Sequence, residues 1–504
     1  MNFQLTVLLL IPAIGSLVIS LFPDQKGQTL KGIALLFTII TFLYSLPLII
    51  QFEPQSDIMQ FVYNVPWFDV GFFHIHYHVG IDGISLFLVI LTTFLMPLVI
   101  LASWNVRTKI RSYLFFILML EVGMVGVFIA LDLVLFYVFW EVTLIPMYFL
   151  IGVWGGARRI YAAVKFFIYT MTGSLLMLVA IITLYFFNDA KDFDLVRITD
   201  RLSSGEISIS PVAELLLFLA FFIAFAIKIP LFPLHTWLPD AHVEAPTGGS
   251  VILASILLKM GAYGLLRFCL PMFPNASLSL APLICVLAIV GILYGSLVAM
   301  VQPDIKKLIA YSSVSHLGFV VLGIFSFNLQ SIEGATFQML GHGLSTGGLF
   351  LLVGMIYDRR HSHLIQDFGG LASTMPRYAS FFMIFVLSSI GLPGLSGFVG
   401  EFLILQGAFL AKYSYAIWAT LGIVLSAICM LWMYQRVFFG ITEHEENRVL
   451  TDLNLRETAT LIPLVILILW MGLYPTTFLH RMDASIHKVV ARLEITHQLE
   501  YREP

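Results

Sequence analysis

The chain has 504 residues, of which 59% are hydrophobic and 11% are charged, and its formal net charge is −3. Soluble domains carry about 25% charged residues, so this composition excludes a soluble single-core protein and indicates a polytopic membrane protein. No basic block points to a nucleic-acid partner. The three cysteines, Cys269, Cys285 and Cys429, form no CxxC pair, so the sequence offers no ligand set for zinc, an iron–sulfur cluster or a disulfide framework.

Apolar stretches of about 20 residues predict about fourteen membrane spans. The N-terminal stretch lacks a positively charged region, so we interpret it as the first span rather than as a signal peptide. The predicted spans lie near residues 3–21, 29–51, 81–103, 112–129, 131–151, 163–187, 212–231, 246–270, 279–301, 306–326, 332–356, 379–411, 413–437 and 457–475.

Two of these spans are predicted to be broken. The span near 379–411 is too long for one straight crossing and contains the sequence GLPG at 391–394. The seventh span ends near Ile229 and is followed by Pro230 and Pro233. Proline removes a backbone donor and clashes with the preceding helical turn. The freed backbone groups at membrane depth must then be satisfied by protein or by water.

The broken spans occupy matching positions in two groups of five, spans 4–8 and spans 9–13. Because five is an odd number, consecutive groups have opposite topology, and interrupted helices at matching positions of inverted repeats are typical of transporters. Proline is also common in membrane helices without such symmetry. The predicted fold is an all-α polytopic membrane protein with about fourteen transmembrane helices, two inverted five-helix repeats and broken helices 7 and 12. The predicted parts are residues 1–111 (spans 1–3 with a β-type loop at 52–79), 112–270 (first repeat), 271–440 (second repeat) and 441–504 (last span and a short C-terminal tail).

Lysine and arginine gather in the loops on one side of the predicted membrane. Because such loops face the cytoplasm, both termini are expected on the non-cytoplasmic side. The loop HTWLPDAHVEAPTGG between spans 7 and 8 contains Asp240 and Glu244 but no lysine or arginine, which indicates a constraint other than topology. The basic set comprises Lys26, Lys31, Arg107, Lys109, Arg111, Arg158, Arg159, Lys165, Lys306, Lys307, Arg359, Arg360, Arg377, Arg436, Arg448 and Arg456.

Four ionisable residues interrupt predicted spans, namely Glu141, Lys228, Lys259 and Glu401. A charge at the bilayer centre costs about 2.5–3.5 kcal/mol on insertion scales, and such groups usually line ion or proton paths. Low dielectric favours the neutral form of each group, whereas a nearby opposite charge favours the ionised form. Glu141 and Lys228 are therefore a candidate pair near a protonation switch, and Lys259 is the next titratable step. A purely structural ion pair is the alternative.

Two histidines extend this series. His316 follows a serine-rich stretch in span 10, and His342 lies among small residues in span 11. Histidine exchanges protons near neutral pH, and small residues permit close helix approach. A packed, hydrogen-bonded histidine is the alternative, and nothing else in the chain supports haem ligation.

Three further histidines, His74, His76 and His78, alternate in the loop after span 2. Alternation predicts a short strand with all three on one face. Three histidines could bind zinc, but no fourth ligand is evident, and we interpret the segment as an exposed β segment. Glu121 in span 4 is a further buried acid without an assigned role.

The run KIPLFPLHTWLPDAHVEAPTGGSVILASILLKMGAYGLLR at 228–267 resembles the signature of the antiporter-like membrane subunits of respiratory complex I. The segments DIKKLIAYSSVSHLGFV (304–320) and LPGLSGFVGEF (392–402) are similar to that family too. Glu401 in the twelfth span, the Trp140-Glu141 step and the short C-terminal tail resemble the chain 4 type, subunit M, rather than the L and N types.

This resemblance implies a proton-translocating membrane-arm subunit of NADH:quinone oxidoreductase. It implies a catalytic proton relay in which Glu141 and Lys228 form the input pair. Lys259 with His316 and His342 would be the central relay, and Glu401 the terminal exchange residue. Partners would be the L-like and N-like membrane chains and lipid, with ubiquinone or menaquinone acting through the complex. No cofactor is expected in this chain, since NADH, FMN and the iron–sulfur clusters would belong to partner subunits.

The expected location is the inner, cytoplasmic membrane of a bacterium. Three alternatives remain at this stage: a subunit of a cation/proton antiporter complex, a subunit of a membrane-bound hydrogenase-type complex, and a self-sufficient solute transporter.

Overall fold

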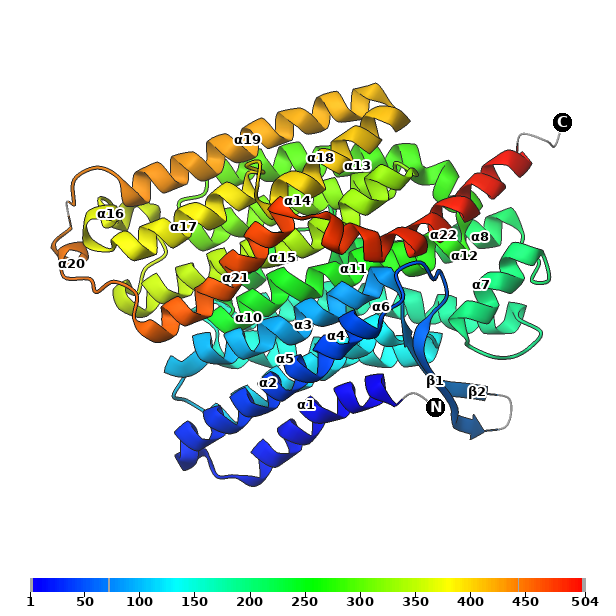
Figure 1. Cartoon of the computed structure of the whole chain (residues 1–504), viewed down its shortest axis with the longest axis horizontal. Helices are drawn as coiled ribbons and strands as arrows, with labels where there is room; N and C mark the ends of the chain where they lie inside the picture. Colours follow the sequence, from blue (N-terminus) through cyan, green and yellow to red (C-terminus); the bar gives the residue numbers. More distant parts are fainter. Residues whose placement is uncertain (1–2, 71–72, 443, 501–504) are drawn as a thin grey trace.

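The computed structural model describes residues 3–70, 73–442 and 444–500. Within these residues, 13 helices are long and apolar enough to cross a membrane, and they run side by side along the long axis of the molecule (Figure 1). They are α1 (Gln4–Leu21), α2 (Gly27–Gln51), α3 (Gly83–Ala102), α4 (Ile110–Ile129), α5 (Leu133–Trp154), α6 (Arg159–Phe187), α8 (Pro211–Lys228), the segment Thr247–Met272, α13 (Pro274–Met300), α14 (Ile305–Ile324), α15 (Leu329–Arg360), α19 (Tyr413–Phe438) and α21 (Leu455–Leu473).

The predicted twelfth span is a pair of shorter helices, α17 (Pro376–Ser389) and α18 (Ser396–Ala411). Between them, Gly391 has φ +74° and Gly394 has φ +91°. Glycine adopts this left-handed region without the steric cost that a Cβ imposes. The predicted break is therefore confirmed, and this pair with the 13 long helices accounts for the about fourteen predicted spans.

The seventh span also ends in a break, because α8 stops at Lys228. The indole Nε1 of Trp237 donates to the carbonyl oxygen of Ile227 at 2.9 Å, so a buried side chain satisfies one backbone group that the break frees. The segment expected to be a loop between spans 7 and 8 contains a helix, α9 (Trp237–Glu244), packed against α6 and α14. The carboxylate of Asp240 pairs with Lys165 of α6 at 2.7 Å, which explains why this segment carries acidic residues.

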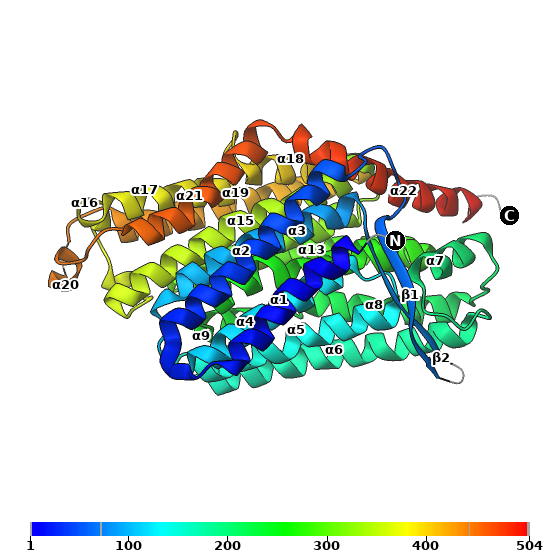
Figure 2. The ribbon, with the colours of Figure 1, turned by 60° about the horizontal axis from the view of Figure 1, so that its bottom comes forward.

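An antiparallel hairpin of β1 (Gln60–Val70) and β2 (Phe73–Ile81) follows α2. It lies at the same end of the helix bundle as α7 (Leu195–Ser204), while α16 (Leu371–Thr374) and α20 (Glu445–Arg448) lie at the opposite end (Figure 2). We call the first of these the hairpin end. The start of α1 and the end of α22 (Thr476–Glu500) both lie there (Figure 1), as expected for an even number of crossings.

The hairpin confirms the predicted strand, but its three histidines are not all exposed as predicted. His74 is exposed, and His76 Nδ1 lies 2.7 Å from Asn64 Oδ1. His78 is 7% exposed, and its Nδ1 lies 2.9 Å from a carboxylate oxygen of Asp194. The interpretation of an exposed face is therefore wrong for His78, because the N-terminus of α7 covers the inner part of the strand.

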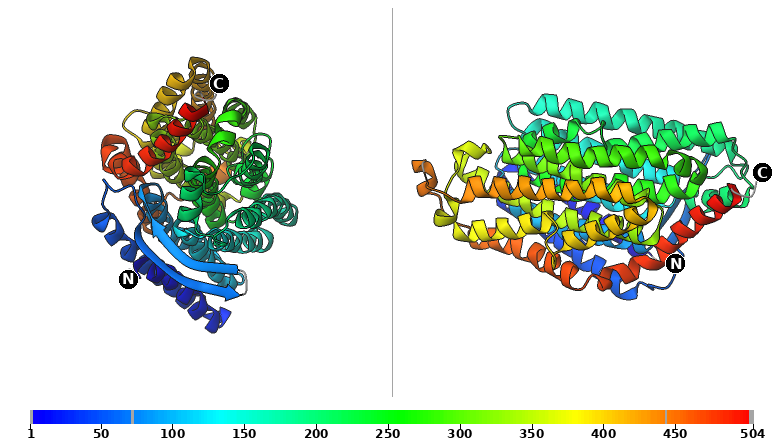
Figure 3. Two further views of the ribbon diagram at one scale, coloured as in Figure 1. Left: turned by 90° about the vertical axis from the view of Figure 1, so that its right-hand side faces the viewer. Right: turned by 90° about the horizontal axis from the view of Figure 1, so that it is seen from above.

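The residues after the last span form the helix α22 rather than an irregular tail. Met482, Ile486, Val489, Val490 and Leu493 are buried, and their spacing defines one apolar helix face. That face packs against α3, α12 (Leu270–Met272), α13 and α15. Figure 3 shows α22 running obliquely across the bundle, so it joins the N-terminal spans to both predicted repeats.

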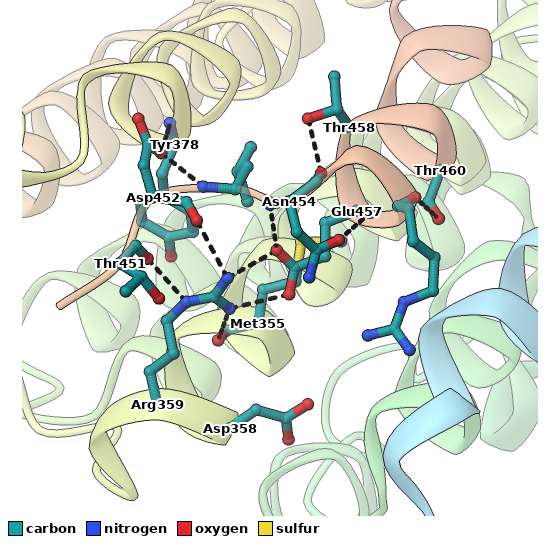
Figure 4. A network of polar contacts seen from close by, with 12 residues as sticks. Met355, Asp358, Arg359, Tyr378, Thr451, Asp452, Asn454, Glu457, Thr458 and Thr460 are labelled. Atoms are coloured by element: carbon teal, nitrogen blue, oxygen red, sulfur yellow. Dashed lines mark hydrogen bonds and ion pairs between the residues drawn. The ribbon is translucent and has the colours of Figure 1, made fainter.

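A bidentate ion pair ties the last span to α15. Arg359 Nη2 lies 2.6 Å from Glu457 Oε2, and Nη1 donates to Oε1 at 2.9 Å. Arg359 also donates from Nε to the carbonyl oxygen of Thr451 at 2.8 Å (Figure 4). Glu457 in turn caps the backbone N–H of Asn454 at the start of α21. The network therefore holds α21 against α15 at the end opposite the hairpin.

Candidate functional site

Two membrane spans have their apolar segments fully buried within the bundle. The most apolar windows of Thr247–Met272 and of α15 are 100% buried, whereas that of the outer helix α2 is 28% buried. The first contributes Lys259, which is 0% exposed, and the second contributes His342, which is 2% exposed. Lys259 Nζ lies 2.7 Å from His342 Nδ1. The two side chains therefore form a direct titratable contact in the core.

The helix around Lys259 is locally widened. Residues Leu253–Leu257 and Leu265–Cys269 are π-helical, and they flank α11 (Leu258–Gly264), which carries the lysine. Such turns disrupt the regular α-helical bonding pattern and are frequent at functional sites. Lys259 Nζ donates to the carbonyl oxygen of Ala254 at 2.5 Å. The widened helix thus supplies a backbone acceptor that holds the lysine head beside His342.

A second cluster surrounds Glu401 of α18. His316 Nδ1 of α14 lies 2.8 Å from Glu401 Oε1, and Gln338 Nε2 of α15 donates to the same oxygen at 3.0 Å. The other ring nitrogen of His316, Nε2, lies 3.2 Å from the hydroxyl of Ser389 at the end of α17. Both ring nitrogens of the histidine therefore have polar partners, and one partner is a carboxylate.

The two clusters are neighbours, because the rings of His316 and His342 lie 5.6 Å apart between centroids. Lys259, His342, His316 and Glu401 consequently form one buried series drawn from four separate spans. Their types, an amine, two imidazoles and a carboxylate, can each accept and release a proton. The arrangement thus places four proton-exchanging groups in one buried row, with a gap between the two histidine rings.

Lys228 and Glu141 lie apart from this series. Lys228 is 1% exposed, and its Nζ lies 5.0 Å from the ring centroid of Trp140, the residue before Glu141. Glu141 and Lys228 interact electrostatically, but among the described residues no ion pair joins them, and Glu141 Oε1 is buried without a hydrogen-bond partner. The structure therefore places the two side chains in one neighbourhood without a direct contact.

The break after Lys228 approaches the helix that carries Lys259. A Cβ on Gly261 would lie 2.7 Å from the carbonyl oxygen of Phe225 and 3.0 Å from the backbone nitrogen of Ile229. Only glycine permits this backbone approach. Gly261 is two residues from Lys259, so the end of α8 is packed directly against the lysine-bearing turn.

Three buried cationic or titratable residues were missing from the predicted site. His242 of α9 is 0% exposed and stacks on Phe350 with ring centroids 4.4 Å apart. Within the described part of the chain, neither ring nitrogen of His242 or of His235 has a hydrogen-bond partner. Lys306 Nζ donates to the carbonyl oxygen of Ala245 at 2.5 Å. The unusual absence of lysine and arginine from 235–249 was the sequence signal that could have directed attention to this region.

Glu121 of α4 is also buried, at 0% exposure. Among the described residues, neither of its carboxylate oxygens has a hydrogen-bond partner. It belongs to neither cluster, and the contacts around it assign it no role.

Family models match most of the chain. The model described as NADH:quinone oxidoreductase/Mrp antiporter, transmembrane, matches residues 130–429. The model described as NADH-ubiquinone oxidoreductase chain 4, amino terminus, matches residues 9–127. The two matches together cover most of the predicted N-terminal spans and of both predicted repeats.

Individual relatives indicate the same family as these models. The chain is 47% identical over 500 residues to the NADH-quinone oxidoreductase subunit M of Rhodobacter capsulatus, covering 97% of each chain. It is 46% identical to the NADH-ubiquinone oxidoreductase chain 4 of Arabidopsis thaliana, again over 97% of each. A chain of respiratory complex I from Thermus thermophilus superposes with a TM-score of 0.86 at 32% identity, covering 96% of this chain and 99% of that one. The chain therefore belongs to the NADH:quinone oxidoreductase/Mrp antiporter family of membrane subunits, in its subunit M, or chain 4, branch.

Proposed function

We propose that this chain, a proton-translocating membrane-arm subunit of an NADH:quinone oxidoreductase, moves protons along Lys259, His342, His316 and Glu401. The observation that carries the proposal is the contact series itself, with 2.7 Å between Lys259 and His342 and 2.8 Å between His316 and Glu401. Lys228 and Glu141 act on this series as an input pair. Electron transfer belongs to other subunits of the complex.

Charge coupling drives the transfers between these groups. At about 4 Å and an effective dielectric of about 20, one unit charge changes the free energy of protonating a neighbouring group by about 4 kcal/mol, or roughly three pKa units. At helix spacings of about 8–10 Å, the effect is about 2 kcal/mol. Opening or closing the Lys228–Glu141 pair can therefore bias the protonation of Lys259 without a direct contact.

Two features support a route from the end opposite the hairpin. A cavity of about 240 Å³ opens there between the loops, and its lining includes Tyr113, Glu244 and Lys306. His242 is buried beside this region, since Lys306 Nζ donates to the carbonyl oxygen of the next residue, Val243, at 3.3 Å. We assign this end to the cytoplasm by the distribution of lysine and arginine, which puts both termini on the non-cytoplasmic side of a bacterial inner membrane.

The predicted inverted repeats agree with this route. The breaks after Lys228 and near Gly391 each lie beside a residue of the proposed relay, as expected where discontinuous helices of two inverted repeats line one pathway. The division into residues 1–111, 112–270, 271–440 and 441–504 follows the same scheme.

Partners and cofactors follow from the relatives. L-like and N-like antiporter-like chains are the proposed neighbours, and NADH, FMN, iron–sulfur clusters and the quinone would be bound by other subunits. The high identity to NADH-quinone oxidoreductase subunits over 97% of the chain favours this role over a cation/proton antiporter, a hydrogenase-type complex or a self-sufficient solute transporter.

The input pair provides the test. Replacing Lys228 with methionine or Glu141 with glutamine in the purified complex, reconstituted in liposomes, should lower the number of protons pumped per NADH oxidised about 30-fold, because about 2 kcal/mol of charge coupling is lost. The measurement is internal or external pH during NADH oxidation. Unchanged proton stoichiometry in both variants would contradict the proposed input role.

The turn at Gly391 should be needed for activity as well as for stability. A Cβ at this position would lie 3.0 Å from Glu401 Oε2 in a backbone conformation with φ +74°. Gly391→Ala should destabilise the chain by about 1–3 kcal/mol and reduce pumping by displacing the carboxylate. Gly440→Ala is the matched control, since Gly440 has φ +89° and its Cβ would meet nothing within 4 Å. Equal pumping by the two variants would exclude the effect on Glu401.

A further inference from the structure

The hairpin end of the bundle contains a cavity of about 410 Å³ lined by both charged and apolar residues. Its lining comes from the strands β1 and β2, residues 57–59 before β1, the helices α7, α12 and α22, and the residues Asp194, Asp82 and Arg267. Arg267, Tyr263 and Lys259 follow one another at four-residue intervals on the same span, so they share one helix face. Lys259 lies eight residues, or about two helical turns, deeper than Arg267 on this span. The cavity and Lys259 are thus separated by Arg267 and Tyr263.

A buried ion pair forms the inner wall of this cavity. Arg267 Nη2 lies 2.5 Å from Asp82 Oδ1, and the two side chains are 10% and 5% exposed. Arg267 Nε donates to the hydroxyl oxygen of Tyr263 at 3.2 Å. The hydroxyl of Tyr263 donates in turn to the carbonyl oxygen of Phe128 at 3.2 Å. The hydrogen bonds therefore all point one way, from the guanidinium to a backbone carbonyl.

Such a series cannot relay a proton. Relay requires each group to accept a proton on one side and release one on the other, but a guanidinium has donors only and is not deprotonated in proteins. Tyr263 accepts from Arg267, and its own proton is committed to a backbone oxygen. Asp82 Oδ1 accepts hydrogen bonds from the backbone of Ile84 and Ser85 and forms the ion pair with Arg267. Arg267 Nε and the Tyr263 hydroxyl, which lie between the cavity and Lys259, are therefore both engaged in hydrogen bonds.

We propose that Arg267, Asp82 and Tyr263 form a proton seal between Lys259 and the hairpin-end cavity. A relay lysine open to both sides of the membrane would let pumped protons return, so a pump needs a closed side at this step. The seal rests on the proposed relay through Lys259, and it directs protons toward Glu401.

Passive proton leak tests the seal without any pumping. The complex carrying Arg267→Ala with Asp82→Asn is reconstituted in liposomes, a potassium diffusion potential is imposed without NADH, and internal pH is followed. The leak should rise at least about tenfold over the unaltered complex. Arg359→Ala with Glu457→Gln is the matched control, because it removes another buried arginine–carboxylate pair, at the opposite end, and should leave the leak unchanged.

The variant Arg267→Lys distinguishes loss of the seal from a failure of the double variant to fold. It retains the ion pair with Asp82, but a lysine can release its proton, so this variant should also leak while assembling normally. If neither Arg267 variant raised the passive proton leak, the proposed seal would be rejected. An equal leak in the Arg359 control would also reject it.

Adding Lys259→Met to the leaking variants identifies the path. The leak should disappear, because methionine carries no proton, and a persistent leak would overturn the proposal by showing a path that bypasses Lys259. NADH-driven pumping by Lys259→Met alone is a separate readout. Normal pumping by that variant would reject the relay, whereas the leak measurements would still report on the barrier at Arg267.

Discussion

Replacing Lys259 with methionine should abolish coupled proton pumping. Lys259 is 0% exposed and is the contact between the widened span and His342. Methionine has a similar length but can neither hold nor release a proton, so the series loses its first central member. Removal of a proton-transfer group typically costs about 10²–10⁴-fold, and we expect the initial rate of proton uptake per NADH oxidised to fall by at least about 10²-fold.

Two companion variants separate relay from structure. Lys259→Arg keeps the positive charge but cannot release its proton, so it should assemble and yet fail to pump. Lys412→Met removes an exposed lysine near the ring of Tyr415 and should leave pumping unchanged. Full pumping by Lys259→Arg would mean that the charge of this residue matters and its proton does not.

Glu401→Gln should have an effect of similar size. The amide preserves the shape of the side chain but cannot accept the proton that His316 would deliver across 2.8 Å. Proton release should therefore stop at this step, with pumping lowered about 10²-fold or more while the complex stays assembled. The measurement is proton release in inverted membrane vesicles or liposomes during NADH oxidation.

Glu214 offers the matched control for Glu401. It is 9% exposed and accepts hydrogen bonds from Asn275 Nδ2 at 3.0 Å and from the backbone nitrogen of Ala276 at 3.1 Å. Glu214→Gln thus alters another buried, hydrogen-bonded carboxyl group, outside the relay. If Glu214→Gln lowers pumping as much as Glu401→Gln does, the loss reflects packing and not proton transfer.

The spans and their breaks could be read from local sequence. A membrane helix shows itself through about 20 consecutive apolar residues, and the predicted boundaries lie within a few residues of the helices in most cases, as in 413–437 against Tyr413–Phe438. The GLPG sequence predicted the turn at Gly391, because glycine and proline act on their own backbone. The ionisable residues were visible for the same local reason, since a charge stands out in an apolar run.

Contacts between distant segments could not be read in this way. Nothing local places His342 against Lys259, 83 positions away, or His316 against Glu401, 85 positions away. The burial of His78 depends on α7, which is distant in the sequence. The apolar face of α22 is buried only because the folded spans provide a surface against which it packs. The loop assignment for 235–249 was wrong about α9 because short buried helices lack the length that identifies a span.

By itself, the sequence determined the membrane class, the approximate number and limits of the spans, the broken helices and the presence of ionisable residues within the spans, because each of these depends on composition or on neighbours in the chain. The tertiary structure decided the order of those residues in space, the gap between Lys228 and Glu141, and the burial of Arg267 against Asp82 and Tyr263. Side-chain contacts across helices depend on how the spans pack, and packing brings together residues that share no local pattern.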